Sequence, residues 1–145
     1  LSTGLALAFV AAQVAGAIFG TWLAHAMFAE PLLQTSETIR TGRPQWLAEI
    51  VATFGLVFII LAGLRTRADA IPWLVGLYIT AAYWFTASTS FANPAVAIGR
   101  AFTNTFSGIR PVDLPGFIIS ELVGATLAVI LANWLYRTVG SQPQS

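Results

Sequence analysis

The chain has 145 residues, of which 57% are hydrophobic and only 9% are charged, whereas a soluble domain carries about 25% charged residues. This composition excludes an ordinary soluble domain and predicts an all-α polytopic membrane protein. A net charge of +1 offers no basic field to nucleic acid, so nucleic-acid binding is excluded. With no cysteine and one histidine, the composition also predicts no bound metal and no cofactor.

Long apolar stretches predict four membrane-spanning helices within a single membrane domain, residues 1–145. A bilayer core of about 30 Å needs ~20 apolar helical residues, and the stretches lie at about residues 4–27, 45–64, 70–88 and 114–136. Only the second and the fourth contain an acid, Glu49 and Glu121 respectively. Residues 140–145 are predicted to be disordered, and the start at Leu1 rather than Met predicts a fragment of a longer chain.

The first and the last predicted spans resemble each other. A shift of 108 positions aligns six pairs of residues: Phe9 with Phe117, Gln13 with Glu121, Gly16 with Gly124, Ala17 with Ala125, Leu23 with Leu131, and Ala24 with Ala132. Small residues let helices approach closely, and a polar residue one turn earlier is placed for a hydrogen bond between helices. Internal duplication of this kind is typical of transporters and channels.

Residues 89–108 predict a short helix that enters the membrane without crossing it. Asn93 is a typical N-cap and Pro94 a typical first helical residue, while Gly108 marks the end, which gives a helix at about residues 94–107. Such a helix is about 21 Å long, too short to cross a bilayer. A helix lying flat on the interface is the alternative, but Arg100 is its only charge up to residue 102, which favours the re-entrant placement.

A re-entrant helix implies a pore or a binding site, because non-helical backbone at this depth must line a wet cavity or be buried in protein. Its N-terminus presents the positive end of the helix dipole, and the Asn93 amide adds N–H donors. These groups favour neutral hydroxylated molecules and repel cations. The residues therefore predict a site for small uncharged solutes.

The triplet Asn93, Pro94 and Ala95 resembles the signature of the aquaporin, or major intrinsic protein, family. Residues 48–54 resemble the opening of that family's fourth helix and residues 12–17 its third helix. The resemblance implies an aquaporin-like bundle with one re-entrant half-helix, part of an inverted repeat. The chain would be the carboxyl-terminal two-thirds, helices three to six, and would form a passive channel for water, glycerol-like polyols or neutral metalloid acids.

One departure from the family concerns the residue after the triplet, which is Val96 where the second triplet of the family is followed by arginine. The sequence Asn-Pro-Ala-Val is similar to the family's first triplet, so residues 45–145 could instead be the first repeat; the upstream segment that resembles the third helix argues against this. Arg100, one turn further along on nearly the same face, is expected to face the pore in place of that arginine. Its alternative role is to bind backbone carbonyls of the connecting loop.

The resemblance also implies roles for other residues near the pore. One of Tyr83, Trp84 and Phe85 is expected to narrow the constriction, unless all three form an interfacial aromatic belt. Three polar residues are expected to be structural buttresses of the half-helix and the bundle: Glu49, Gln13 and Glu121.

Two further functions remain open beside the channel. Glu49 or Glu121 could serve a proton-coupled exporter of small molecules, since intramembrane acids often carry protons, or the chain could be a non-conducting fragment. The sequence offers no catalytic constellation, so we expect no enzyme. The expected partners are membrane lipid and a water or small neutral solute, with a homotetramer and a plasma (inner) membrane location implied by the resemblance.

Overall fold

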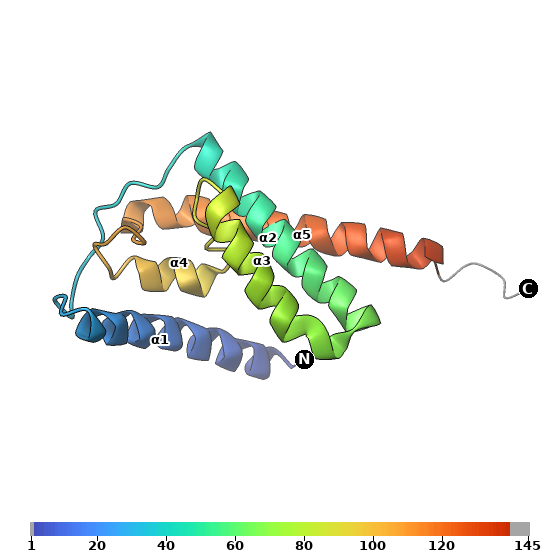
Figure 1. The fold of residues 1–145 in the computed structure, drawn as a ribbon, viewed down its shortest axis with the longest axis horizontal. Coiled ribbons are helices and arrows are strands. Elements are labelled where there is room, and N and C mark those ends of the chain that lie inside the picture. The colour runs from blue at the N-terminus through green and yellow to red at the C-terminus, as the bar shows by residue number, and fades with distance from the viewer. Residues whose placement is uncertain (1, 140–145) are drawn as a thin grey trace, which may run out of the picture. The chain divides into compact units, whose positions relative to one another are not determined.

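The computed structural model describes residues 2–139, and these residues form helices and no strand (Figure 1). The all-α prediction is thereby confirmed. The α-helices are α1 (Thr3–Met27), α2 (Arg43–Thr66), α3 (Ile71–Phe85), α4 (Pro94–Arg100) and α5 (Leu114–Val139), with short 3-10 turns η1 (Ala68–Ala70) and η2 (Pro111–Asp113). The tail predicted to be disordered, residues 140–145, lies outside the described residues.

Three of the described helical segments are long and apolar enough to cross a membrane: Thr3–Met27, Arg43–Thr66 and Pro111–Arg137. Their exposed apolar side chains make the chain an integral membrane protein in contact with lipid. They coincide with three of the four predicted spans. The span predicted at residues 70–88 is instead the 15-residue helix α3, which ends at Phe85 because Thr86 is extended and its Oγ1 donates 2.7 Å to the Ala82 carbonyl.

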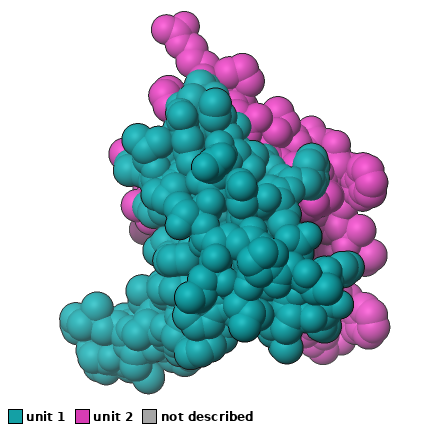
Figure 2. Space-filling view, turned by 90° about the vertical axis from the view of Figure 1, so that its left-hand side faces the viewer, with its two compact units in different colours: residues 1–42, 93–118 teal, residues 43–92, 119–145 magenta. Residues whose placement is uncertain are grey.

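The described residues divide into two compact units, which Figure 2 distinguishes by colour. Of the described residues, unit 1 comprises residues 2–42 and 93–118, and unit 2 comprises residues 43–92 and 119–139. Unit 1 therefore contains α1 and α4, whereas unit 2 contains α2 and α3.

Unit 1 is built on a close approach between α1 and α4. A Cβ atom added to Gly99 would lie 2.8 Å from the Ala17 Cβ and 3.0 Å from the Ala17 carbonyl oxygen, so no larger residue fits without a shift. Thr21 Oγ1 then donates both to Ala17 O at 2.9 Å and to Gly99 O at 3.2 Å. A hydroxyl that bonds two helices at a contact of small residues is a common way to hold helices in lipid.

In unit 2 a second small residue allows another close contact. A Cβ on Gly124 of α5 would collide with the Ile50 carbonyl oxygen of α2 and lie 3.0 Å from Phe54 N. Gly16, its partner in the sequence repeat, has no other atom within 4 Å of such a Cβ. The repeated glycine is therefore at a helix contact in the second copy, at Gly124, but not in the first copy, at Gly16, among the described residues.

The half-helix begins where predicted but ends earlier. The predicted end near residue 107 is wrong, because α4 stops at Arg100. To continue the helix, Arg100 O would have to accept from Asn104 N. Instead, Arg100 O accepts from Ile109 N at 3.2 Å, and Asn104 N donates to the Gln34 side-chain oxygen at 2.8 Å. These long-range partners satisfy the backbone groups that a longer helix would have used.

Candidate functional site

The N-terminus of α4 has the cap geometry that the sequence predicts. Asn93 is the N-cap in an extended conformation, and its Oδ1 accepts from Ala95 N at 2.8 Å. Pro94 occupies the first turn, where its missing N–H costs no helical hydrogen bond. Asn93 Nδ2 donates to Gln13 Oε1 on α1 at 3.3 Å. The predicted cap is confirmed, and the amide of Asn93 is oriented by one acceptor contact and one donor contact within unit 1.

The chain directly before α4 is a strained loop, residues 86–92, which we call the upstream loop. Thr89, Ser90 and Ala92 have φ values of 63°, 49° and 51°. In this left-handed region a residue with a Cβ costs about 1–2 kcal/mol. The loop therefore needs specific contacts to hold its conformation.

Glu49 supplies two of those contacts from α2. Its Oε1 accepts from Phe91 N at 2.9 Å and its Oε2 accepts from Ala92 N at 2.8 Å, and the side chain is 0% exposed. Both carboxylate oxygens therefore bind backbone N–H groups of the upstream loop. Sequence resemblance suggested a buttress at this position, but the left-handed residues have no sequence signal, since none of them is glycine.

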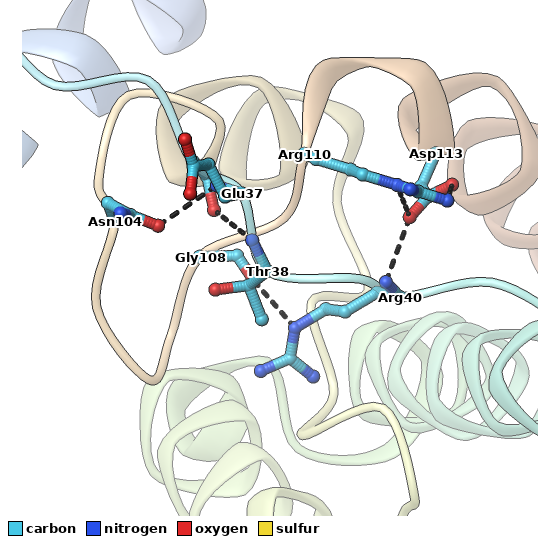
Figure 3. Close-up of polar contacts among 8 residues, drawn as sticks. Glu37, Thr38, Arg40, Asn104, Gly108, Arg110 and Asp113 are labelled. Carbon is cyan, nitrogen blue, oxygen red and sulfur yellow. Dashed lines mark hydrogen bonds and ion pairs between the residues drawn. The ribbon is translucent and has the colours of Figure 1, made fainter.

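We call the segment after α4, residues 101–110, the downstream loop; it lies within unit 1. Hydrogen bonds join this loop to the connection between α1 and α2, residues 30–42. The contacts are Ser36 N to Ala101 O (2.9 Å), Arg110 N to Thr38 O (2.9 Å), Thr38 Oγ1 to Thr105 O (3.2 Å), Glu37 N to Asn104 Oδ1 (2.9 Å) and Asn104 N to Gln34 Oε1 (2.8 Å). Figure 3 shows the contact between Glu37 and Asn104 that joins the two segments.

A buried arginine of the same connection also binds the downstream loop. Arg40 is 6% exposed, and its guanidinium donates to Gly108 O at 2.7 Å and to Phe106 O at 2.8 Å. Its backbone N donates to Asp113 Oδ2 at 2.9 Å, and the same carboxylate forms an ion pair with Arg110 at 2.9 Å (Figure 3). The hydrogen bond to Asp113 raises the pKa of the Arg110 guanidinium, so this guanidinium stays protonated.

Sequence reasoning did not assign a role to Arg40 or Asp113. The available signal is a pair of opposite charges in two polar connections that are far apart in the chain. The same connections contain or adjoin other charged residues, Arg43, Arg110 and Glu37. From the sequence alone, ion pairs that involve these residues are as plausible as the pairing of Arg40 with Asp113. Only the folded backbone selects Arg40 as the buried member.

Unit 1 contains a cavity of about 580 Å³ beside α4. Val96, the residue after the triplet, and Arg100, which was predicted to face the pore, both line this cavity. The downstream loop contributes a polar wall of Thr103, Thr105 and Ser107, whose hydroxyl oxygens are 3.0 and 3.2 Å apart in sequence order. The small and apolar residues of the α1 wall are Gly16, Ala17, Gly20 and Ala24. The same α1 wall also carries Thr21 and His25. The downstream loop therefore offers a row of three hydroxyl groups, and the α1 wall is mostly small residues with two polar side chains.

The remaining predicted site residues take different environments. Trp84 is 83% exposed and Phe85 57% exposed, whereas Tyr83 is half-buried. Glu121 is buried at 1% exposure on α5. Their roles in a constriction or as a buttress stay predictions. Among the described residues, no group of three or more His, Cys, Asp and Glu is placed to hold a metal ion.

Comparison with known proteins gives one clear relative. The chain is 70% identical over 130 residues to the aquaglyceroporin AqpS of Rhizobium meliloti (strain 1021). The match covers 90% of this chain but 56% of that protein, so the chain spans little more than half the length of the curated relative. No protein-family model and no solved structure matches the chain.

Proposed function

Because the chain belongs to the aquaporin, or major intrinsic protein, family, we propose that it is part of a passive channel for water and small uncharged solutes. Glycerol-like polyols and neutral metalloid acids are the solutes that we propose beside water. The family resemblance is supported by the high identity to an aquaglyceroporin. The chain is an integral membrane protein of the plasma, or inner, membrane. A passive channel catalyses no reaction, so we propose no enzyme activity for it.

The observation that carries this proposal is the orientation of the Asn93 amide. Its oxygen is used by Ala95 N, so the nitrogen Nδ2 is the group directed away from the helix cap. The 3.3 Å bond from Nδ2 to Gln13 is long for a hydrogen bond, and a passing solute oxygen would replace Gln13 as acceptor at low cost. Because α4 has only seven residues, we assign recognition to this amide rather than to a helix dipole.

Val96 and Arg100 are proposed to set the width of the pore. Val96 is uncharged at the position directly after the triplet, where arginine follows the family's second triplet, and Arg100 lines the same cavity one turn later. A cation displaced in this way leaves more room beside the triplet, which favours polyols and metalloid acids as well as water. One aromatic residue, for which Tyr83 as the least exposed of its group is our choice, is proposed to narrow the constriction.

The proton-coupled exporter gains no support from Glu49. Both of its oxygens accept from backbone N–H groups and its side chain is 0% exposed, so its contacts are those of a structural anchor. We propose that Glu49, Gln13 and Glu121 are structural buttresses. A homotetramer is the assembly that we propose from the family, and native mass spectrometry of the purified protein checks it.

The substitution Asn93→Asp tests the proposed function. Aspartate is as good an N-cap as asparagine, so α4 should still begin at Pro94, but the amide donor is lost and a negative charge faces the solute. We expect solute and water permeability of proteoliposomes, measured by stopped-flow light scattering on the full-length protein, to fall about tenfold, the loss of roughly 1.4 kcal/mol at the barrier.

Asn104→Asp is the matched control. It makes the same chemical change on an exposed residue and keeps the Oδ1 that accepts from Glu37 N. Its permeability should equal that of the wild type. Unchanged permeability of Asn93→Asp would overturn the role of the amide. Wild-type flux that requires a proton gradient would favour the exporter, and no wild-type flux would favour a non-conducting module.

A further inference from the structure

Arg40 holds the downstream loop by a bidentate contact. Its Nε and Nη2 donate to Gly108 O and Phe106 O, two carbonyls that are two residues apart in one turn. Its Cζ also lies 6.0 Å from the centre of the Phe106 ring. A guanidinium donates in a rigid planar fork, so both carbonyls must face it in one fixed orientation. An ammonium group has no such fork and cannot impose that orientation.

The backbone of Arg40 is held as firmly as its side chain. Its N–H donates to Asp113 Oδ2, and Asp113 is oriented by two further hydrogen bonds from Arg110, of 2.9 and 3.1 Å (Figure 3). Charged hydrogen bonds of this kind are about twice as strong as neutral ones. Arg40 is thus fixed at two points, and through its fork it fixes the downstream loop.

The downstream loop has little freedom to adjust where Arg40 binds it. A Cβ on Gly108 would collide with Thr103 O and with Ser36 Oγ. The downstream loop and the connection between α1 and α2 are therefore in contact at Gly108. The hydroxyls of Thr103, Thr105 and Ser107 precede Gly108 directly and line the cavity together with Arg100. Among the described residues that line this cavity, Arg40 is not included. Arg40 therefore acts on the polar wall through the backbone that it holds.

We propose that Arg40, oriented by Asp113, is a positioning residue that sets the selectivity of the channel between polyols and water. It holds the hydroxyl row of Thr103, Thr105 and Ser107 in a fixed arrangement, so that a polyol with several hydroxyl groups exchanges its hydrogen bonds along the row while its carbon side faces the small residues of α1. Water needs no such extended match, because one molecule bonds to one or two groups at a time. This proposal rests on the proposed channel function.

The conservative variant Arg40→Lys tests the proposal in the full-length protein. Lysine keeps the positive charge but not the fork. We expect glycerol permeability to fall about threefold or more while water permeability changes less than about twofold, the size of effect common for coupled neighbouring residues. Stopped-flow measurements on the same proteoliposome preparations give both values, and the unfolding temperature is measured in parallel. Arg43→Lys, an exposed arginine three residues away, is the control and should leave both permeabilities unchanged.

A double-mutant cycle distinguishes positioning from a general loss of structure. The variant Thr105→Val with Ser107→Ala removes two hydroxyls of the row, and Arg40→Lys added to it should cause no further loss of glycerol permeability. The proposal is overturned if Arg40→Lys leaves the glycerol-to-water ratio unchanged, whether or not the unfolding temperature falls. It is also overturned if the losses add in the triple variant. A wild-type protein that conducts neither solute overturns the proposed function itself, before any variant is compared.

Discussion

The two loops that flank α4 are held by buried charges of opposite sign. In unit 2 the upstream loop turns backbone N–H groups toward the carboxylate of Glu49. In unit 1 the downstream loop turns backbone C=O groups toward the guanidinium of Arg40. A carboxylate only accepts and a guanidinium only donates. The sign of each buried charge therefore follows from which backbone group its loop turns inward.

The two loops differ in how much strain they carry. The upstream loop has three residues with a Cβ in the left-handed region, whereas the downstream loop has none among its described residues and uses Gly108 at its closest approach. A strained loop depends on its anchor to keep its conformation, and an unstrained loop depends on its anchor mainly for precision. We therefore expect removal of the Glu49 anchor to cost stability and removal of the Arg40 anchor to cost selectivity.

The largest expected effect is that of Glu49→Gln. The amide nitrogen replaces one acceptor oxygen and meets a backbone N–H, so one buried charged hydrogen bond is lost and two donors face each other. We expect a loss of about 2–4 kcal/mol in the free energy of unfolding, measured by denaturation in mixed micelles. Glu37→Gln, on an exposed side chain, should change it by less than about 0.5 kcal/mol. Equal stability of the two variants would show that the upstream loop holds its strained conformation without this anchor.

Gly108→Ala should have an intermediate effect and tests the close approach in the downstream loop. The added Cβ collides with Thr103 O, a backbone atom that cannot rotate away. We expect a loss of about 1–3 kcal/mol, typical of overpacking, measured in the same unfolding assay. Gly76→Ala in α3 is the control, because its Cβ would have nothing within 4 Å and should gain about 0.5–1 kcal/mol. If the Gly108→Ala variant is as stable as the wild type, the downstream loop can shift to make room for the added Cβ, although Arg40 binds it.

The exposed pair of Arg67 and Asp69 gives the smallest expected effect and a baseline for the buried anchors. Their side chains are 71% and 70% exposed, and the hydrogen bond from Arg67 lowers the pKa of Asp69 below its ordinary 3.8. A lowered carboxyl pKa contributes stability above the ordinary value, and that contribution is lost as pH falls through the lowered pKa. We expect Arg67→Gln to raise the Asp69 pKa in an NMR titration with no measurable change in stability at neutral pH. A loss as large as that of Glu49→Gln would show that burial is not what makes the loop anchors important.

Much of the helical structure was predictable because its causes are local. An apolar run of sufficient length has few alternatives to a spanning helix, and α1, α2 and α5 were identified on that basis. Asn93 and Pro94 likewise predicted the start of α4, since cap preference depends on the next few residues only. The family resemblance came from the same triplet together with residues 12–17 and 48–54.

The end of α4 and the anchors were not predictable because their causes are distant in the chain. Gly108 was expected to end the helix, but the helix stops at Arg100, whose carbonyl accepts from Ile109 while Ser36 N takes the Ala101 carbonyl. Neither partner is distinguished by local pattern. The repeated glycines make the same point, since a Cβ added to Gly124 would collide with the Ile50 carbonyl oxygen, whereas a Cβ added to Gly16 would meet no neighbouring element within 4 Å among the described residues.

Composition and short motifs were thus enough to place this chain in a membrane, to locate its long helices and to identify the triplet at the head of α4. These features depend on the cost of exposing apolar or polar groups to the wrong solvent and on bonds within one turn of backbone. The three-dimensional arrangement alone decided where α4 ends, which of several charges become buried, and that Glu49 and Arg40 hold the two loops. The two anchors depend on hydrogen bonds between residues more than forty positions apart, and the end of α4 depends on bonds from Ile109 and Ser36. No local pattern specifies these pairings.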